Sequence, residues 1–77
     1  MVLEVLGTGC AKCKQLHAMV VKVVEESGVQ AEIRKVEDLP SILERGVLST
    51  PALVKDGRVL VAGRIPSAKE VASWLAT

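Results

Sequence analysis

Two cysteines, Cys10 and Cys13, are the residues of this 77-residue chain whose type and spacing point most directly to chemistry. They are the chain's two cysteines and stand in a C-x-x-C arrangement with Ala11 and Lys12 between them. In a reducing compartment such a pair indicates metal binding or redox catalysis rather than a structural staple. A disulfide between them would close a very short loop, so it would restrict the unfolded chain little.

The cysteine pair lies where a short apolar run, residues 2–6, gives way to a helical pattern over residues 11–27. The first turn of a helix has unpaired backbone N–H groups and the positive end of the helix dipole, and both favour a thiolate over a thiol. Lys12 and Lys14 add positive charge nearby. Such surroundings lower a cysteine pKa from about 8.5 to roughly 3.5–7.5, and the thiolate is the nucleophile in disulfide exchange.

Position along this helix predicts a role for each residue. Cys10, at the exposed helix start, is predicted to be the attacking nucleophile, and Cys13, one turn further in, to resolve the mixed disulfide. Lys12 is predicted to stabilise the thiolate. His17 follows Cys13 by four residues, and we interpret it as a solvated residue on the helix rim rather than a metal ligand.

The chain that follows predicts a strand and a short helix. Residues 29–36 alternate between apolar and polar side chains, which indicates a strand with one wetter face at a sheet edge. Asp38 can then cap a short helix that tolerates Pro40 in its first turn. Three side chains are expected to form the apolar face of that helix: Leu39, Ile42 and Leu43.

Two further signals organise the C-terminal part. Asp56-Gly57 separates two apolar runs and is typical of a type I′ hairpin turn, which needs positive φ at both central positions. Ser67 and Glu70 have the spacing of a helix capping box. The last helix is expected to run to about Ala76 and to bury three side chains: Val71, Trp74 and Leu75.

These elements give the order β-α-β-α-β-β-α. The first β-α-β unit should be parallel and right-handed, and the closing β-β unit an antiparallel hairpin. We therefore predict one α/β domain, residues 1–77, with a mixed four-stranded sheet and helices on both faces. The composition agrees, because 49% of the residues are hydrophobic and almost all of these are aliphatic, which suits a sheet covered by helices.

Charge and hydropathy argue against two classes of partner. Ten basic residues are balanced by nine acidic ones, and the chain lacks the basic stripe with stacking aromatics that nucleic-acid binders carry. No apolar run is long enough to cross a bilayer, and the N-terminus lacks the basic region of a secretory signal. We expect a cytoplasmic monomer that binds neither nucleic acid nor membrane.

Three motifs together make the chain resemble the thioredoxin superfamily, and within it the small, glutaredoxin-sized proteins of archaea and bacteria. They are Gly-Thr-Gly-Cys-Ala-Lys-Cys at residues 7–13, Ser-Thr-Pro-Ala at 49–52 and Val-Ala-Gly-Arg at 61–64. The resemblance covers essentially the whole chain. It implies a thioredoxin-like fold and a thiol–disulfide oxidoreductase that acts on protein disulfides through its dithiol, without a cofactor.

The same resemblance implies several site features. The Thr50–Pro51 bond should be cis and face the dithiol, so that the backbone at Thr50 offers strand-like hydrogen bonds to an extended substrate. Glu4 stands where thioredoxins carry a buried acid, and it would accept the proton of the second cysteine if burial raised its pKa. Five residues are expected to contact the substrate: Gly9, Ala11, Thr50, Pro51 and Gly63.

The sequence also departs from its relatives. Gly9 replaces the active-site Trp of larger thioredoxins, and Ala11-Lys12 replaces their Gly-Pro, so their redox potential does not carry over. Residues 63–67 lack the acid with which glutaredoxins bind the glutathione amine. We therefore expect glutathione to be a poor partner, and a thioredoxin-reductase-like protein to be the electron donor.

Two alternatives remain compatible with the C-x-x-C pair. A heavy-metal-associated carrier would use both thiolates to bind Cu(I) or Zn, but such domains end in a strand and usually carry Met where Thr8 stands. A non-catalytic module that keeps the fold is the other alternative. The preferred hypothesis assigns no metal to the site.

Overall fold

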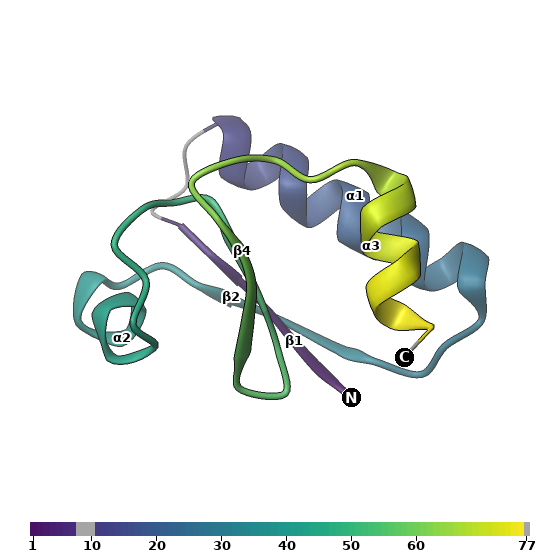
Figure 1. The fold of residues 1–77 in the computed structure, drawn as a ribbon, viewed down its shortest axis with the longest axis horizontal. Helices are drawn as coiled ribbons and strands as arrows, with labels where there is room; N and C mark the ends of the chain where they lie inside the picture. The colour runs from purple at the N-terminus through teal and green to yellow at the C-terminus, as the bar shows by residue number, and fades with distance from the viewer. Residues whose placement is uncertain (8–10, 77) are drawn as a thin grey trace.

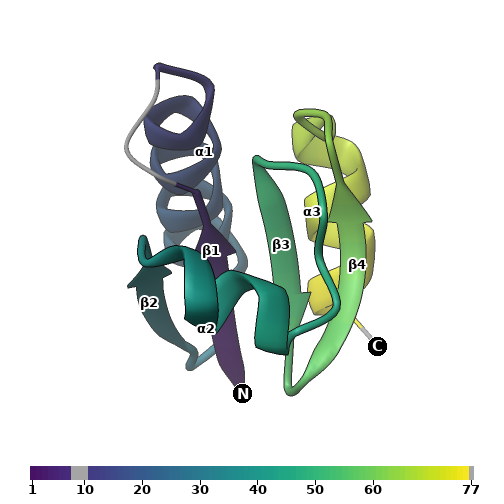
Figure 2. The same ribbon diagram turned by 90° about the vertical axis from the view of Figure 1, so that its left-hand side faces the viewer.

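The computed structural model describes residues 1–7 and 11–76 (Figure 1). Four strands form one mixed sheet in the order β2-β1-β3-β4 (Figure 2). The strands are β1 (Val2–Leu6), β2 (Glu32–Val36), β3 (Ala52–Lys55) and β4 (Arg58–Ala62). The helices are α1 (Ala11–Ser27), α2 (Leu39–Glu44) and α3 (Ala68–Leu75). Their order along the chain, β1-α1-β2-α2-β3-β4-α3, confirms the predicted α/β arrangement.

The pairing of the strands follows the prediction, except that β2 is shorter than expected. β1 runs parallel to β2 and antiparallel to β3, and β3 and β4 form an antiparallel hairpin. β2 lies at the edge of the sheet, as its alternating pattern indicated. It begins at Glu32 rather than at residue 29, because β1 starts at Val2 and Val2 pairs with Glu32.

Helices cover both faces of the sheet, which places two apolar clusters on its two sides (Figure 2). One cluster joins β1 to α1 and α3: Leu3, Val5, Leu16, Val20, Val23, Val24, Leu53, Val61, Val71 and Leu75. The other lies on the face that α2 covers: Leu6, Val36, Ile42, Val47, Ala52 and Val54. Side chains alternate along a strand, so Leu3 and Val5 face α1 while Glu4 and Leu6 face α2.

The short helix α2 is capped as predicted but buries less than predicted. The Asp38 carboxylate accepts a hydrogen bond from an amide of the first turn at 3.1 Å. Ile42 is 2% exposed, whereas Leu39 and Leu43 are 61% and 57% exposed, so the expectation of a three-residue apolar face was wrong. A six-residue helix presents little more than one side chain to the sheet, and Val47, just beyond the helix, completes that cluster.

The last helix begins with the predicted capping box. Ser67 Oγ accepts a hydrogen bond from the Glu70 N–H, and the Glu70 carboxylate accepts one from the Ser67 N–H. Val71 and Leu75 are buried as expected. Trp74 is half-buried rather than buried, since its side chain lies at the border of the α1-side cluster.

The β3–β4 hairpin marks one end of the sheet. Asp56 and Gly57 have φ angles of 49° and 85°, as a type I′ turn requires. The Asp56 carboxylate accepts a hydrogen bond from the Val2 N–H at 2.8 Å, and Lys55 Nζ donates one to the Trp74 carbonyl at 2.7 Å. The hairpin, the start of β1 and the end of α3 therefore meet at one end, opposite the end where β1 leads toward α1 (Figure 2).

Candidate active site

The candidate site lies where β1 ends. The Gly7 N–H donates a hydrogen bond to the Val36 carbonyl at 2.9 Å, which extends the β1–β2 ladder by one residue. On the other side of β1, Leu6 pairs with Ala52, so the start of β3 lies beside the end of β1. Gly7 is thereby brought next to the segment that precedes β3, where the sequence predicted the cis proline.

Cys13 packs against this end of the sheet from the first turn of α1. Its side chain is only 5% exposed. A Cβ atom placed on Gly7 would overlap Cys13 Sγ, and would lie 2.9 Å from Cys13 Cβ and 3.9 Å from Thr50 Cβ. Because Gly7 has no side chain, Cys13 can occupy that space, and Cys13, Gly7 and Thr50 form one cluster.

The segment before β3 has the backbone that the resemblance implied. The Thr50–Pro51 peptide bond is cis, and the Pro51 side chain is fully buried. The Gly63 N–H donates a hydrogen bond to the Pro51 carbonyl at 2.9 Å. Gly63 has a φ of 83°, and a Cβ there would lie 3.2 Å from Ser49 Cβ. Three of the five predicted substrate-contacting residues therefore lie together: Thr50, Pro51 and Gly63.

The structure describes only some of the other residues predicted to lie near the dithiol. Gly9 and Cys10 lie outside the described residues, so their predicted roles stay predictions. Ala11 is the first residue of α1, and both Ala11 and Lys12 are exposed. Cys10 directly precedes Ala11 in the sequence, so the prediction that the dithiol lies at the start of this helix is consistent with where α1 begins.

Glu4 is buried, but its surroundings do not suit the predicted proton acceptor. It is 8% exposed and lies on the α2 face of the sheet, whereas Cys13 approaches from the α1 face. Arg45 Nη2 lies 2.6 Å from Glu4 Oε2, and Arg45 Nε lies 3.0 Å from Oε1. Hydrogen bonding from Arg45 lowers the pKa of Glu4 and outweighs the opposing effect of burial.

The expectation of a raised pKa at Glu4 is therefore corrected. The carboxylate forms a two-point ion pair that fastens β1 to the end of α2, and Arg45 also donates a hydrogen bond to the Ser41 carbonyl at 2.9 Å. The sequence signalled the buried acid by its place in an apolar strand. It gave no sign of the partner, which lies 41 residues away.

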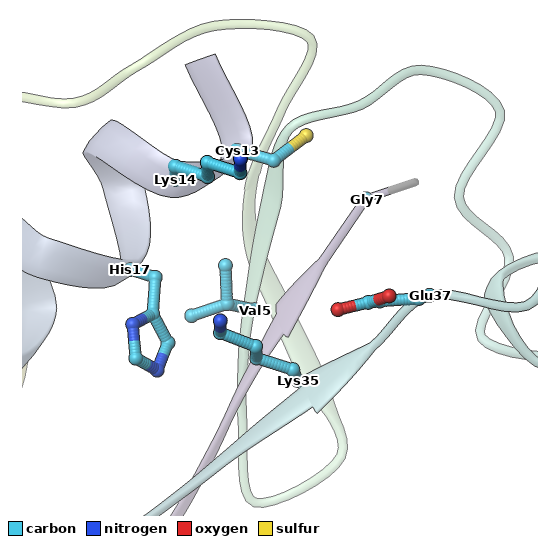
Figure 3. A pocket seen from close by; sticks show the side chains of 7 residues that line it. All are labelled: Val5, Gly7, Cys13, Lys14, His17, Lys35 and Glu37. Atoms are coloured by element: carbon cyan, nitrogen blue, oxygen red, sulfur yellow. The ribbon is translucent and has the colours of Figure 1, made fainter. Parts of the chain in front are cut away.

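A pocket beside Cys13 contains residues that the sequence did not bring together (Figure 3). Cys13, Lys14 and His17 line it from α1, and Val5 and Gly7 line it from β1 and its end. Two residues from β2 and the segment after it complete the wall: Lys35 and Glu37. The sequence signal that could have located this pocket was the predicted parallel β1–β2 pair, because the carboxyl ends of parallel strands form a shared edge where ligands bind.

The structure gives no support to the metal-carrier alternative. Within residues 1–7 and 11–76, no group of three or more His, Cys, Asp or Glu side chains could hold a metal ion. The chain closes with α3 after the hairpin, not with the strand that heavy-metal-associated domains require. In the same part of the chain, no helix has the length and apolar character needed to cross a membrane.

Comparison with known proteins agrees with this geometry. A family model described as a thioredoxin domain matches residues 1–76. The chain belongs to the thioredoxin family. It is 37% identical over 71 residues to a thioredoxin of Methanothermobacter thermautotrophicus, covering 92% of each protein. It is 44% identical over 70 residues to a thioredoxin of Methanocaldococcus jannaschii, covering 91% of this chain and 80% of that one. Thioredoxins are protein disulfide oxidoreductases, and this thioredoxin-family chain is an enzyme of that class.

Proposed function

We propose that the chain reduces protein disulfides, or in the reverse direction oxidises protein dithiols, through Cys10 and Cys13, with Cys10 as the attacking thiolate and Cys13 as the resolving thiol. The observation that carries the proposal is the packing of Cys13 against Gly7 and Thr50 at the end of the sheet. A thiol that is 5% exposed is poorly placed to meet a protein substrate first. It is well placed to attack a mixed disulfide formed on its neighbour in the motif.

Thiol–disulfide exchange with a substrate disulfide takes two steps. The Cys10 thiolate attacks one sulfur of the substrate disulfide, whose S–S bond breaks as a mixed disulfide forms and one substrate thiolate leaves. Cys13 then gives its proton to solvent or to the substrate thiolate released in the first step, and attacks the Cys10 sulfur, which breaks the mixed disulfide and releases the second substrate thiolate. The substrate gains two electrons, and the enzyme is left with a Cys10–Cys13 disulfide that a reductase must reduce.

Neighbouring residues are proposed to assist both steps. Lys12 is exposed on the first turn of α1, and its ammonium group adds to the positive potential of the helix start. Thr50, which directly precedes Pro51 and β3, is proposed to align an extended substrate segment through its backbone. A thioredoxin-reductase-like protein is the proposed electron donor, and glutathione is expected to be a poor one.

Insulin reduction with dithiothreitol tests the assignment of the two cysteines. We expect Cys10→Ser to abolish the activity and Cys13→Ser to accumulate a covalent adduct with the substrate, visible by mass spectrometry. Ser73→Ala, on an exposed part of α3, is the control and should leave the rate unchanged. An adduct that accumulates with Cys10→Ser instead would reverse the two roles.

Alkylation kinetics test the physical basis of the proposal. The rate of reaction with iodoacetamide between pH 4 and 9 reports the thiolate fraction of Cys10 when Cys13 is replaced by Ser. We expect a midpoint well below the ordinary thiol value of about 8.5. A midpoint at that ordinary value would contradict thiolate stabilisation at the helix start.

A further inference from the structure

The pocket beside Cys13 has a chemistry that the exchange reaction does not use (Figure 3). Its base is formed by Val5 and Gly7, which are both buried and have no polar side chain. Its rim is charged: Lys14 on α1 and Lys35 on β2 are exposed, and both line the opening. A group that enters this pocket therefore meets the ammonium groups at the rim first and apolar surface at the base.

The charge around the pocket is unbalanced. Glu37 contributes one carboxylate against the two lysines. None of the ion pairs among the described residues joins Glu37 to Lys14 or Lys35. The pocket thus has a net positive charge at neutral pH, although the whole chain carries a formal charge of only +1.

The size and position of the pocket limit what it can hold. Its empty volume is about 310 Å³ including the open mouth, which accommodates one side chain rather than a large cofactor. Cys13 forms part of its wall, so any occupant lies beside the resolving thiol.

We propose that this pocket is a substrate subsite for one acidic side chain, an Asp or Glu within a few residues of the disulfide that is exchanged. The inference rests on the proposed function, since it concerns the substrate of the same dithiol. The acidic side chain lies across the mouth of the pocket, so that its methylene groups cover the apolar base at Val5 while its carboxylate stays at the rim between Lys14 and Lys35. Complementary charge of this kind contributes specificity and faster association more than raw affinity.

Matched substrates test the subsite. Three disulfide-bonded peptides, identical except for Glu, Gln or Lys beside one cysteine, are compared by kcat/KM at low ionic strength. We expect Glu to exceed Gln and Gln to exceed Lys, with a Glu-to-Lys ratio of about 3- to 10-fold that shrinks as salt is added.

Variants of the rim connect that preference to the pocket. Lys35→Ala should reduce the preference for Glu, and Glu37→Gln should increase it. Lys22→Ala is the matched control, because Lys22 is an exposed lysine of α1 outside the pocket and its loss changes the net charge equally. Equal effects of Lys22→Ala and Lys35→Ala would assign the preference to overall charge and overturn the subsite.

Failure of the subsite can be told apart from failure of the proposed function. Reduction of all three peptides at the same rate would overturn the subsite and leave the function standing. If no peptide is reduced, the function fails, and the subsite is decided by titrating the protein with the reduced peptides while amide resonances are followed. Shifts at Lys14 and Lys35 with the Glu peptide but not the Gln peptide support the subsite, and their absence overturns it.

Discussion

Gly7 and Cys13 are in direct contact, so that a methyl group on residue 7 would occupy the space of the Cys13 side chain. The contact joins the end of β1 to the first turn of α1. Thr50 borders the same space, since its Cβ would lie 3.9 Å from that methyl group. The absence of a side chain at Gly7 therefore sets how closely Cys13 can approach the segment before β3.

Gly7→Ala should displace Cys13 and destabilise the fold. Overpacking of this kind costs about 1–3 kcal/mol, and a displaced resolving thiol should also slow release of the mixed disulfide. Urea denaturation and the insulin assay measure the two effects. In a Cys13→Ala background the sulfur is gone and the cost of Gly7→Ala should shrink. An equal cost in both backgrounds would contradict the contact with Sγ.

The Glu4–Arg45 ion pair predicts a pH-dependent contribution to stability. The folded pKa of Glu4 lies below its ordinary value of 4.5, so the unfolded chain binds the proton more readily. The contribution is therefore complete above that value and is lost as the pH falls through the lowered pKa. Arg45→Ala should lower the midpoint of thermal unfolding by roughly 5–15 °C at pH 7, because it leaves a buried carboxylate without its partner.

The difference between Arg45→Ala and the parent chain should narrow when the pH is lowered from 7 to 3, as monitored by circular dichroism. Arg58→Ala is the matched control, because Arg58 is an exposed arginine on β4 and is not among the groups that lower the pKa of Glu4. A gap that stays constant down to pH 3 would mean that Glu4 is not the group responsible.

The two kinds of apolar residue in α2 should respond differently to truncation. Ile42→Ala removes a side chain that is 2% exposed and should cost about 2–4 kcal/mol in the free energy of unfolding. Leu43→Ala, at 57% exposure on the same helix, should stay within about 0.5 kcal/mol. Chemical denaturation of both variants checks the pair, and similar costs would indicate that Leu43 is buried in solution.

The capping box predicts a modest loss on Ser67→Ala. Removing the Ser67 hydroxyl leaves one amide of α3 unpaired and should cost about 1 kcal/mol, measured by urea denaturation. Ser73→Ala on the exposed side of the same helix should have little effect. The pKa of Glu70 is lowered to about 2 by Arg64 and by the Ser67 amide, so its contribution should persist to lower pH than that of an ordinary glutamate.

Much of the fold could be predicted because local signals were strong. Asp56-Gly57 fixed the hairpin, Ser67 and Glu70 fixed the start of α3, and the element order followed. The start of β2 was less predictable, because it depends on where the partner strand begins rather than on the alternating pattern of residues 29–36. The exposure of Leu39 and Leu43 also depended on tertiary geometry, since a helix of six residues presents little more than Ile42 to the sheet.

Some features of the candidate site could likewise be predicted from the sequence, and others could not. The resemblance supplied the cis bond before Pro51 and the place of Gly63 beside it. The environment of Glu4 was beyond prediction, because the direction of its pKa shift depends on Arg45, which only the folded chain brings near. The rim of the pocket was missed for the same reason: Lys14 lies on α1 and Lys35 on β2, and only the folded chain brings them to one pocket.

The hydrogen bonds from Val2 to Asp56 and from Lys55 to Trp74 have a practical use. They hold the start of the first strand and the end of the last helix at the hairpin end, opposite the end where β1 finishes and β3 begins (Figure 2). A reporter protein, an affinity tag or a surface linker attached at either terminus therefore points away from approaching substrates. The chain is suited to immobilised or fused formats in which the working end stays accessible.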